Sequence, residues 1–167
     1  MGTAGNRKGY KVFSINTTVR NPQRNIDFLR VLVVFDGLRL DTDNKQKIYR
    51  EFIRTGVYIP NIISNEILEK IENKISLDDD EISKIIRDNP QGPGNNGRVM
   101  TQIRALKDLE FITLRGKRND PVLNITKLGS DYLNGEDVEI VYTKSLLGMH
   151  YGNINRKTVL NKARPFL

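Results

Sequence analysis

The sequence predicts a mostly α-helical α+β domain with one small β-hairpin. Between residues 22 and 88, four stretches repeat apolar residues at helical spacing and are bounded by polar caps and by glycine or proline. Residues 111–125 instead alternate around the basic turn "GKRND", which is typical of a hairpin. With 167 residues, 38% of them hydrophobic, the chain can bury a core as one domain or at most two small ones.

Residues 1–24 are predicted to form a basic N-terminal arm and an extended segment, because "YKVFSINTTV" is rich in β-branched and aromatic residues. A first helix is expected near Pro22, which the first helical turn tolerates, with Asn21 as its N-cap. Gly37 is expected to end this helix. The apolar residues that share its inner face are Ile26, Leu29, Leu32 and Val33.

Residues 25–94 are predicted to form a helical subdomain. After the first helix, "TDNKQKIYREFIRTG" repeats the pattern and stops at Gly56. "SNEILEKIENKI" opens with Ser64 and an acidic first turn, which suits the helix dipole. "SLDDDEISKIIRDNP" takes Ser76 or Asp78 as its cap, and the breaker cluster "QGPGNNG" then marks the clearest internal seam.

Residues 95–135 are predicted to hold a recognition helix, a wing hairpin and a short helix, followed by a C-terminal basic segment at 136–167. The buried face of the recognition helix carries apolar residues at helical spacing: Val99, Ile103, Leu106 and Leu109. The polar residues expected to point elsewhere are Arg98, Thr101, Gln102 and Lys107, with Arg104 near the boundary. The order helix, helix, turn, helix, strand, strand is what a winged helix-turn-helix DNA-binding domain requires.

The charge is strongly basic and unevenly distributed. The formal net charge is +7, with a pI near 9.7. Residues 1–60 carry a net +6, residues 61–94 a net −4, and the two later segments are basic again. This pattern favours a polyanionic partner, although a solubilising surface of uneven charge explains it equally well.

Two groups of polar residues are candidate DNA contacts. A helix fits the major groove of B-DNA, and polar side chains of its N-terminal half can reach base edges. For the recognition helix these are Asn95, Asn96, Arg98, Thr101, Gln102 and Arg104, with Arg115, Lys117 and Arg118 at the wing tip. The second group, before and within the first helix, is Asn16, Thr17, Thr18, Arg20, Asn21 and Arg24. The alternative for both groups is ordinary surface polarity and a structural helix cap.

The sequence resembles a family at "FSINTTVRNPQRNIDFLRVLVVFDG" and again at "GRVMTQIRALKDLEFITLRG", "VLNITKLGSDYL" and the tail "SLLGMHYGNINRKTVLNKARPFL". These motifs are similar to the N-terminal region of type IIS restriction endonucleases of the AlwI family, with FokI and related nicking enzymes as more distant relatives. The resemblance covers about residues 12–135 and the tail. It implies a sequence-specific module of winged-helix-like subdomains that binds double-stranded DNA at a short asymmetric site.

The same resemblance implies a separate or C-terminal nuclease domain that cuts beside the site with Mg²⁺. Members of the family are several times longer, so the chain is expected to be an excised recognition domain, a split subunit or a freestanding regulator. No strand with Pro-Asp followed by Asp/Glu-x-Lys is recognisable, and the tripeptides at 43–45 and 72–74 fall in predicted helices. The chain is therefore expected to bind DNA without catalytic or metal-binding residues of its own.

Other classes of function remain open or are excluded by composition. The absence of cysteine excludes disulfides, and the lone His150 leaves little for a histidine metal site. No signal peptide or membrane span is recognisable, so the cytoplasm is the expected location. The alternatives are a dimeric winged-helix transcriptional regulator that reads a palindrome and a winged helix that binds protein. A nuclease that uses the carboxylates at 43–45 or 72–74 is a further alternative.

Overall fold

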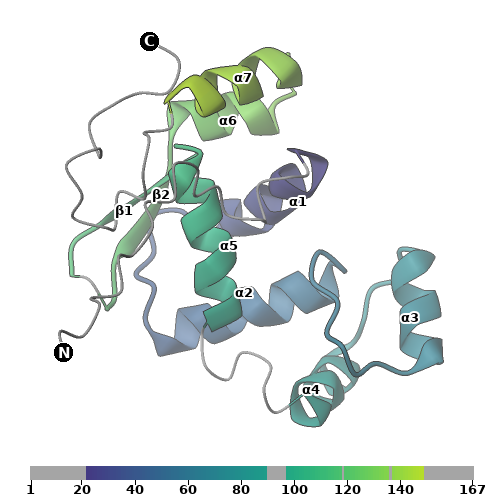
Figure 1. Cartoon of the computed structure of the whole chain (residues 1–167). Coiled ribbons are helices and arrows are strands. Elements are labelled where there is room, and N and C mark those ends of the chain that lie inside the picture. The colour runs from purple at the N-terminus through teal and green to yellow at the C-terminus, as the bar shows by residue number, and fades with distance from the viewer. Residues whose placement is uncertain (1–21, 90–96, 118, 136, 149–167) are drawn as a thin grey trace, which may run out of the picture.

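The computed structural model describes residues 22–89, 97–117, 119–135 and 137–148. Within these ranges the chain is mostly helical with one small antiparallel sheet, which confirms the predicted α+β class (Figure 1). In chain order the elements are α1 (Pro22–Leu32), η2 (Val33–Phe35), α2 (Thr42–Arg54), α3 (Asn65–Glu72), α4 (Asp79–Asp88), α5 (Gly97–Asp108), β1 (Ile112–Arg115), β2 (Val122–Ile125), α6 (Lys127–Leu133) and α7 (Val138–Gly148). None of these helices is long and apolar enough to cross a lipid bilayer.

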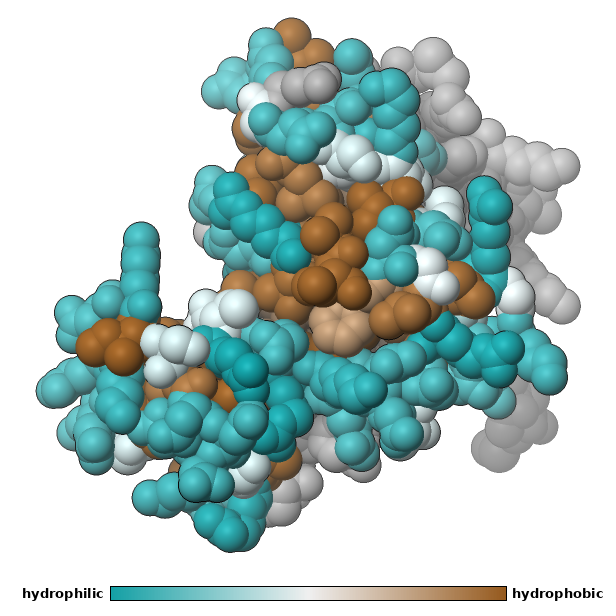
Figure 2. All heavy atoms as spheres, turned by 180° about the vertical axis from the view of Figure 1, so that it is seen from behind, coloured by the Kyte–Doolittle hydropathy of each residue, from teal (hydrophilic) through white to brown (hydrophobic). Residues whose placement is uncertain are grey.

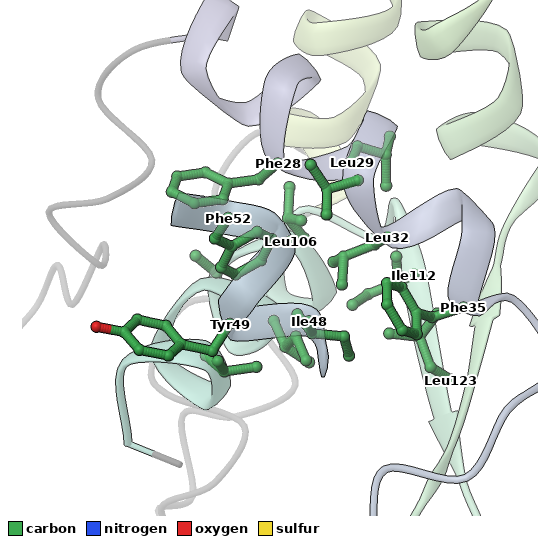
Figure 3. Packing of buried hydrophobic residues seen from close by; sticks show 14 of the residues in the cluster. Phe28, Leu29, Leu32, Phe35, Ile48, Tyr49, Phe52, Leu106, Ile112 and Leu123 are labelled. Atoms are coloured by element: carbon green, nitrogen blue, oxygen red, sulfur yellow. The ribbon is translucent and has the colours of Figure 1, made fainter. Parts of the chain in front are cut away.

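One hydrophobic core joins the N-terminal helices to the hairpin. The helices α1, α2 and α5 contact one another, and Phe28 meets Phe52 edge to face with ring centroids 4.8 Å apart. Ile112 and Leu123 extend this cluster into the sheet (Figure 3). The predicted segments 25–94 and 95–135 therefore share a core and do not pack as separate bodies.

The hairpin has a third chain segment beside it. In the β1–β2 register, Ile112 lies opposite Ile125. On the other side of β2, Gly37 N donates to Leu123 O at 2.8 Å, and Leu123 N donates back to Leu38 O at 3.0 Å. An isolated bridge between Arg39 and Val122 continues this pairing. The segment between η2 and α2 thus covers the outer edge of β2.

The helix starts follow the capping rules. The side chain of Asp41 accepts from Asn44 N, and that of Ser64 accepts from Ile67 N. Asp78, rather than Ser76, caps α4 in a full capping box with Glu81. Each cap satisfies a backbone N–H that the helix leaves without an internal acceptor.

Helix α1 begins at Pro22, as the sequence predicts. Two features of the elements differ from the predictions. Val33 lies in η2 and is 46% exposed, because the α-helix tightens into a 3-10 turn before reaching it. Within 136–167, α7 was not expected, since its apolar residues lie on all sides rather than in one stripe. The expected strand "YKVFSINTTV" lies outside the described residues.

A cluster of aromatic rings packs α6 and α7 against the rest of the core. The rings of Phe111 and Tyr132 stack with centroids 4.5 Å apart, and Tyr142 lies 6.0 Å from Tyr132. The Tyr132 hydroxyl donates to Pro22 O at 2.9 Å, which ties α6 to the start of α1. Burial, with a smaller contribution from Tyr142, raises the pKa of Tyr132 well above its usual range.

We expect Tyr132→Phe to lower the free energy of unfolding by about 1 kcal/mol, because it leaves Pro22 O without its donor while the ring stack survives. Urea unfolding followed by circular dichroism measures this difference. Thr143→Ser, at an exposed position of α7, serves as control and is expected to change the free energy of unfolding by less than about 0.5 kcal/mol, because the two residues have similar helix propensities. Equal stability of Tyr132→Phe and the parent chain would contradict the role of the hydroxyl.

Helix α5 ends with a charged residue where glycine is usual. Glu110 has a φ of 61°, in the left-handed region. Glu110 N donates to Lys107 O and Phe111 N donates to Leu106 O, which together form a Schellman ending. We expect Glu110→Gly to stabilise the fold by about 1 kcal/mol, because glycine adopts this conformation without strain. Thermal unfolding measures the change.

The control is Lys107→Gly, which places glycine inside the helix and is expected to lower the melting temperature. A lower melting temperature for Glu110→Gly as well would be inconsistent with strain at this position.

Candidate nucleic-acid interface

Helix α5 has one face fixed in the core and one face in solvent. Val99, Ile103 and Leu109 are fully buried between α1, α2 and the hairpin, as the sequence predicts. Thr101 and Arg104 lie on the exposed face. The Thr101 hydroxyl donates to Gly97 O at 2.7 Å, so its acceptor lone pairs stay available to solvent.

Gln102 does not point away from the core as expected. Only 8% of it is exposed. The reason is geometric: Gln102 lies three residues after Val99 and four before Leu106, which places all three on one stripe of the helix. A buried amide there is not available to read a base, so Gln102 is no longer a candidate contact. Lys107, also expected to point away, is half-buried.

Several other candidate contacts cannot be placed. The residues that lie outside the described ranges are Asn16, Thr17, Thr18, Arg20, Asn21, Asn95, Asn96 and Arg118. Arg98 stands in the first turn of α5, but its side chain is not described. Arg24 is exposed on the first turn of α1, where its guanidinium lies 5.4 Å from the centroid of the Phe28 ring. Such a contact is attractive and holds the side chain along α1.

The hairpin turn supplies the basic residues that the structure does place. Arg115 and Lys117 are both exposed beside Gly116, whose φ of 93° lets the chain leave β1 sharply. The turn lies in the lower half of Figure 1, toward which the Gly97 end of α5 also points. Arg115 also lines a surface depression together with Lys107 and Glu110, at the C-terminal end of α5.

A buried lysine supports this turn and was not recognised as a functional residue in the sequence. Lys45 of α2 is only 8% exposed, and its Nζ donates to Asn119 O at 3.0 Å. The carboxylate of Asp120 lies 3.9 Å from the same nitrogen. A contact across 74 positions leaves no local sequence pattern, so periodicity could not reveal it. Lys45 thereby fixes the return of the turn against α2.

The acidic stretch "LDDDE" serves helix and ion-pair contacts. Asp78 and Glu81 form the capping box, and Glu81 also pairs with Lys70. This pair raises the pKa of Lys70 and lowers that of Glu81, chiefly through their shared hydrogen bond. Asp79 pairs with Arg50 and Arg54. Within the described ranges, no group of three acidic or histidine side chains lies close enough to hold a metal ion.

An apolar groove of different character is lined by α1, the end of α2 and the end of α3. Apolar side chains gather near the middle of the rear face (Figure 2). A groove of about 820 Å³ is lined by Val31, Val34, Val57, Ile71 and Ile75 together with five charged side chains. Two ion pairs, Asp27–Arg30 at 2.9 Å and Glu51–Arg54 at 3.4 Å, involve four of those charges. Without a clear excess of basic side chains, this groove is not a candidate surface for nucleic acid.

Comparison with known proteins gives little guidance. No family model matches the chain, and no solved structure matches it. The chain is similar to ribonuclease HII of Nanoarchaeum equitans (strain Kin4-M), with 22% identity over 137 residues. The match covers 75% of this chain and 66% of the ribonuclease, so the chain spans less than two thirds of that relative. At this identity the similarity does not assign the chain to a family.

We expect Lys45→Met to speed amide hydrogen exchange at residues 117, 119 and 120 about fivefold, because the turn loses its charged donor. The free energy of unfolding is expected to change by less than about 1 kcal/mol, since the apolar chain avoids the cost of burying an ammonium group. Exchange measured by nuclear magnetic resonance tests both statements. Lys47→Met, at an exposed position of the same helix, is the matched control; identical exchange in both variants would rule out the support.

Proposed function

We propose that this chain binds double-stranded DNA through a winged helix-turn-helix and serves as the recognition part of a type IIS restriction endonuclease of the AlwI kind. The observation that carries the proposal is the placement of α5. Its inner face is buried in the core, its outer face exposes Thr101 and Arg104, and the hairpin that follows it exposes Arg115 and Lys117.

The order and pairing of the elements support the winged-helix reading. Helix α1 is followed by the segment at 37–40, which pairs with β2, and then by α2, α5, β1 and β2. A winged helix has this order, with a short strand between its first two helices. The pair α3 and α4 stands as an insertion between α2 and α5.

The proposed contacts divide into base readout and backbone binding. Arg104 and Thr101 lie on the face of α5 that would enter the major groove, where arginine can donate twice to guanine. Arg115 and Lys117 would neutralise phosphates beside that groove. Lys45 keeps the turn in place for this contact.

Cleavage does not form part of the proposed role of this chain. The resemblance implies a nuclease domain, separate or C-terminal, that works with Mg²⁺. Within the described ranges, no group of three His, Cys, Asp or Glu side chains could hold such an ion. Asp43 and Glu72 stand on exposed helix positions apart from one another, and Lys45 is directed to the turn. No step of the reaction is therefore derived from them.

A second candidate comes from the similarity to a ribonuclease. That relative is named for action on RNA, and the match extends over most of the present chain. Binding of duplexes that contain RNA is therefore the second candidate, with the same basic turn as the contact to the backbone. RNA-containing duplexes differ from B-DNA in groove shape, so one protein surface rarely binds both equally well.

Selection from a randomised DNA duplex pool at about 0.15 M salt tests the proposal. Enrichment of a short asymmetric site is the expected result. A palindrome bound by a dimer in sedimentation would support a transcriptional regulator instead. An RNA–DNA hybrid bound more tightly than the selected site would favour the second candidate. Absence of enrichment, with affinity lost at moderate salt, would overturn sequence-specific binding.

Substitutions then separate the two kinds of contact. We expect Arg104→Ala to lose about 1–3 kcal/mol on the selected site and to relax one base position. Lys117→Ala is expected to weaken specific and random DNA alike and to reduce the slope of log affinity against log salt by about 1. Lys144→Ala, an exposed lysine of α7, is the charge-matched control. Equal losses on specific and random DNA for Arg104→Ala would remove its role in readout.

A further inference from the structure

A second surface lies at the other end of α5, beside β1. A shallow depression of about 640 Å³, here called the β1 concavity, is walled by the last turn of α5, all of β1 and the first residues of α6. Of the residues that line it, only Arg115 is also a proposed DNA contact, and Arg104 lies one helical turn before Lys107. The DNA proposal therefore leaves most of this surface unused.

The concavity follows an open edge of the sheet. Among the described residues, β1 pairs with β2 alone, while the outer edge of β2 is covered by residues 37–40. Thr126 N donates to Phe111 O, which sets the alternation of the backbone groups along β1. The N–H and C=O of Thr113 and Arg115 therefore face β2, and those of Ile112 and Leu114 face away from it. Ile112 is buried, but Leu114 is partly exposed. The N–H and C=O of Leu114 are thus placed to pair with an added strand.

The rim of the concavity is basic. Its lining includes one acidic residue, Glu110, and three basic residues, Lys107, Arg115 and Lys127. Lys127 pairs with Asp131 at 2.9 Å and remains 87% exposed. In the described part of the chain, neither Lys107 nor Arg115 has a carboxylate within ion-pair distance. Lys107 in the last turn of α5 and Arg115 at the end of β1 therefore make the rim complementary to negative charge.

The surface between these charges is apolar, which favours an acidic peptide over a nucleic acid as the ligand. Leu114 and Leu128 are half-buried and line it. A nucleic-acid backbone has no side chain to place on such a floor, and the outward carbonyl of Leu114 repels phosphate. An extended peptide places alternate side chains on opposite faces while its backbone pairs with the edge. We propose that β1 binds an acidic extended segment of a partner protein as an added strand.

The proposal is tested on the full chain with a labelled peptide of about eight residues that alternates glutamate and valine, a length that spans a strand. Fluorescence anisotropy is expected to show saturable binding. The matched peptide that alternates lysine and valine is expected to bind at least about tenfold more weakly, because it meets the same cations with like charge. Hydrogen exchange at the Leu114 amide is expected to slow in the complex.

Two variants distinguish the contribution of the backbone hydrogen bonds to peptide affinity from that of the charges. Leu114→Pro removes the outward N–H but none that faces β2, and is expected to reduce affinity about tenfold. Should that variant unfold, the double variant Lys107→Gln/Arg115→Gln, which leaves the strand unaltered, is expected to give a similar loss. Lys144→Gln on α7 is the control and is expected to bind like the parent chain.

Three results would overturn the proposal: no saturable binding of the acidic peptide, equal binding of both peptides, or unchanged affinity in the folded edge and charge variants. Slowing of Leu114 exchange by a short DNA duplex but not by the peptide would reassign the surface to nucleic acid. Failure of DNA selection alone leaves these readouts intact, since none of them uses DNA.

Discussion

The burial of the inner stripe of α5 is the constraint on which the rest of the structure depends. Ile103 and Leu106 are inserted against α1 and α2, where Phe28 and Phe52 already meet edge to face. Because α5 cannot rotate without exposing these residues, its outer face has a fixed direction. The chain reverses direction at Glu110 and enters β1 directly, so the position of α5 also fixes the orientation of the hairpin.

Local patterns in the sequence predicted the elements whose evidence is itself local. The Ser64 and Asp78 caps, the inner stripe of α5 and the β1–β2 hairpin all follow from spacing within a few residues. The prediction that Gln102 points to solvent is wrong, because its position on the inner stripe of α5 buries it although its side chain is polar. The contact from Lys45 to the turn joins distant segments, and only the folded chain brings them together.

The two candidate surfaces have different chemistry. The exposed face of α5 with Thr101 and Arg104, and the hairpin turn with Arg115 and Lys117, are polar and basic, which suits a nucleic-acid backbone and base edges. The β1 concavity combines cations with an apolar floor and a strand edge that no other described strand pairs with, which suits a polypeptide. The two surfaces share Arg115, and Arg104 of the first lies one helical turn from Lys107 of the second.

The aromatic stack of α6 and α7 has a consequence for spectroscopy. The chain contains six tyrosines and no tryptophan, so its intrinsic fluorescence comes from tyrosine. Tyr132 is fully buried and forms a three-ring cluster with Phe111 and Tyr142, where asymmetric surroundings give tyrosine a strong near-ultraviolet dichroism. Two of the six chromophores therefore sit at one joint, where α6 meets the start of α1. The protein carries a natural optical probe for the docking of its C-terminal helices, with no label needed.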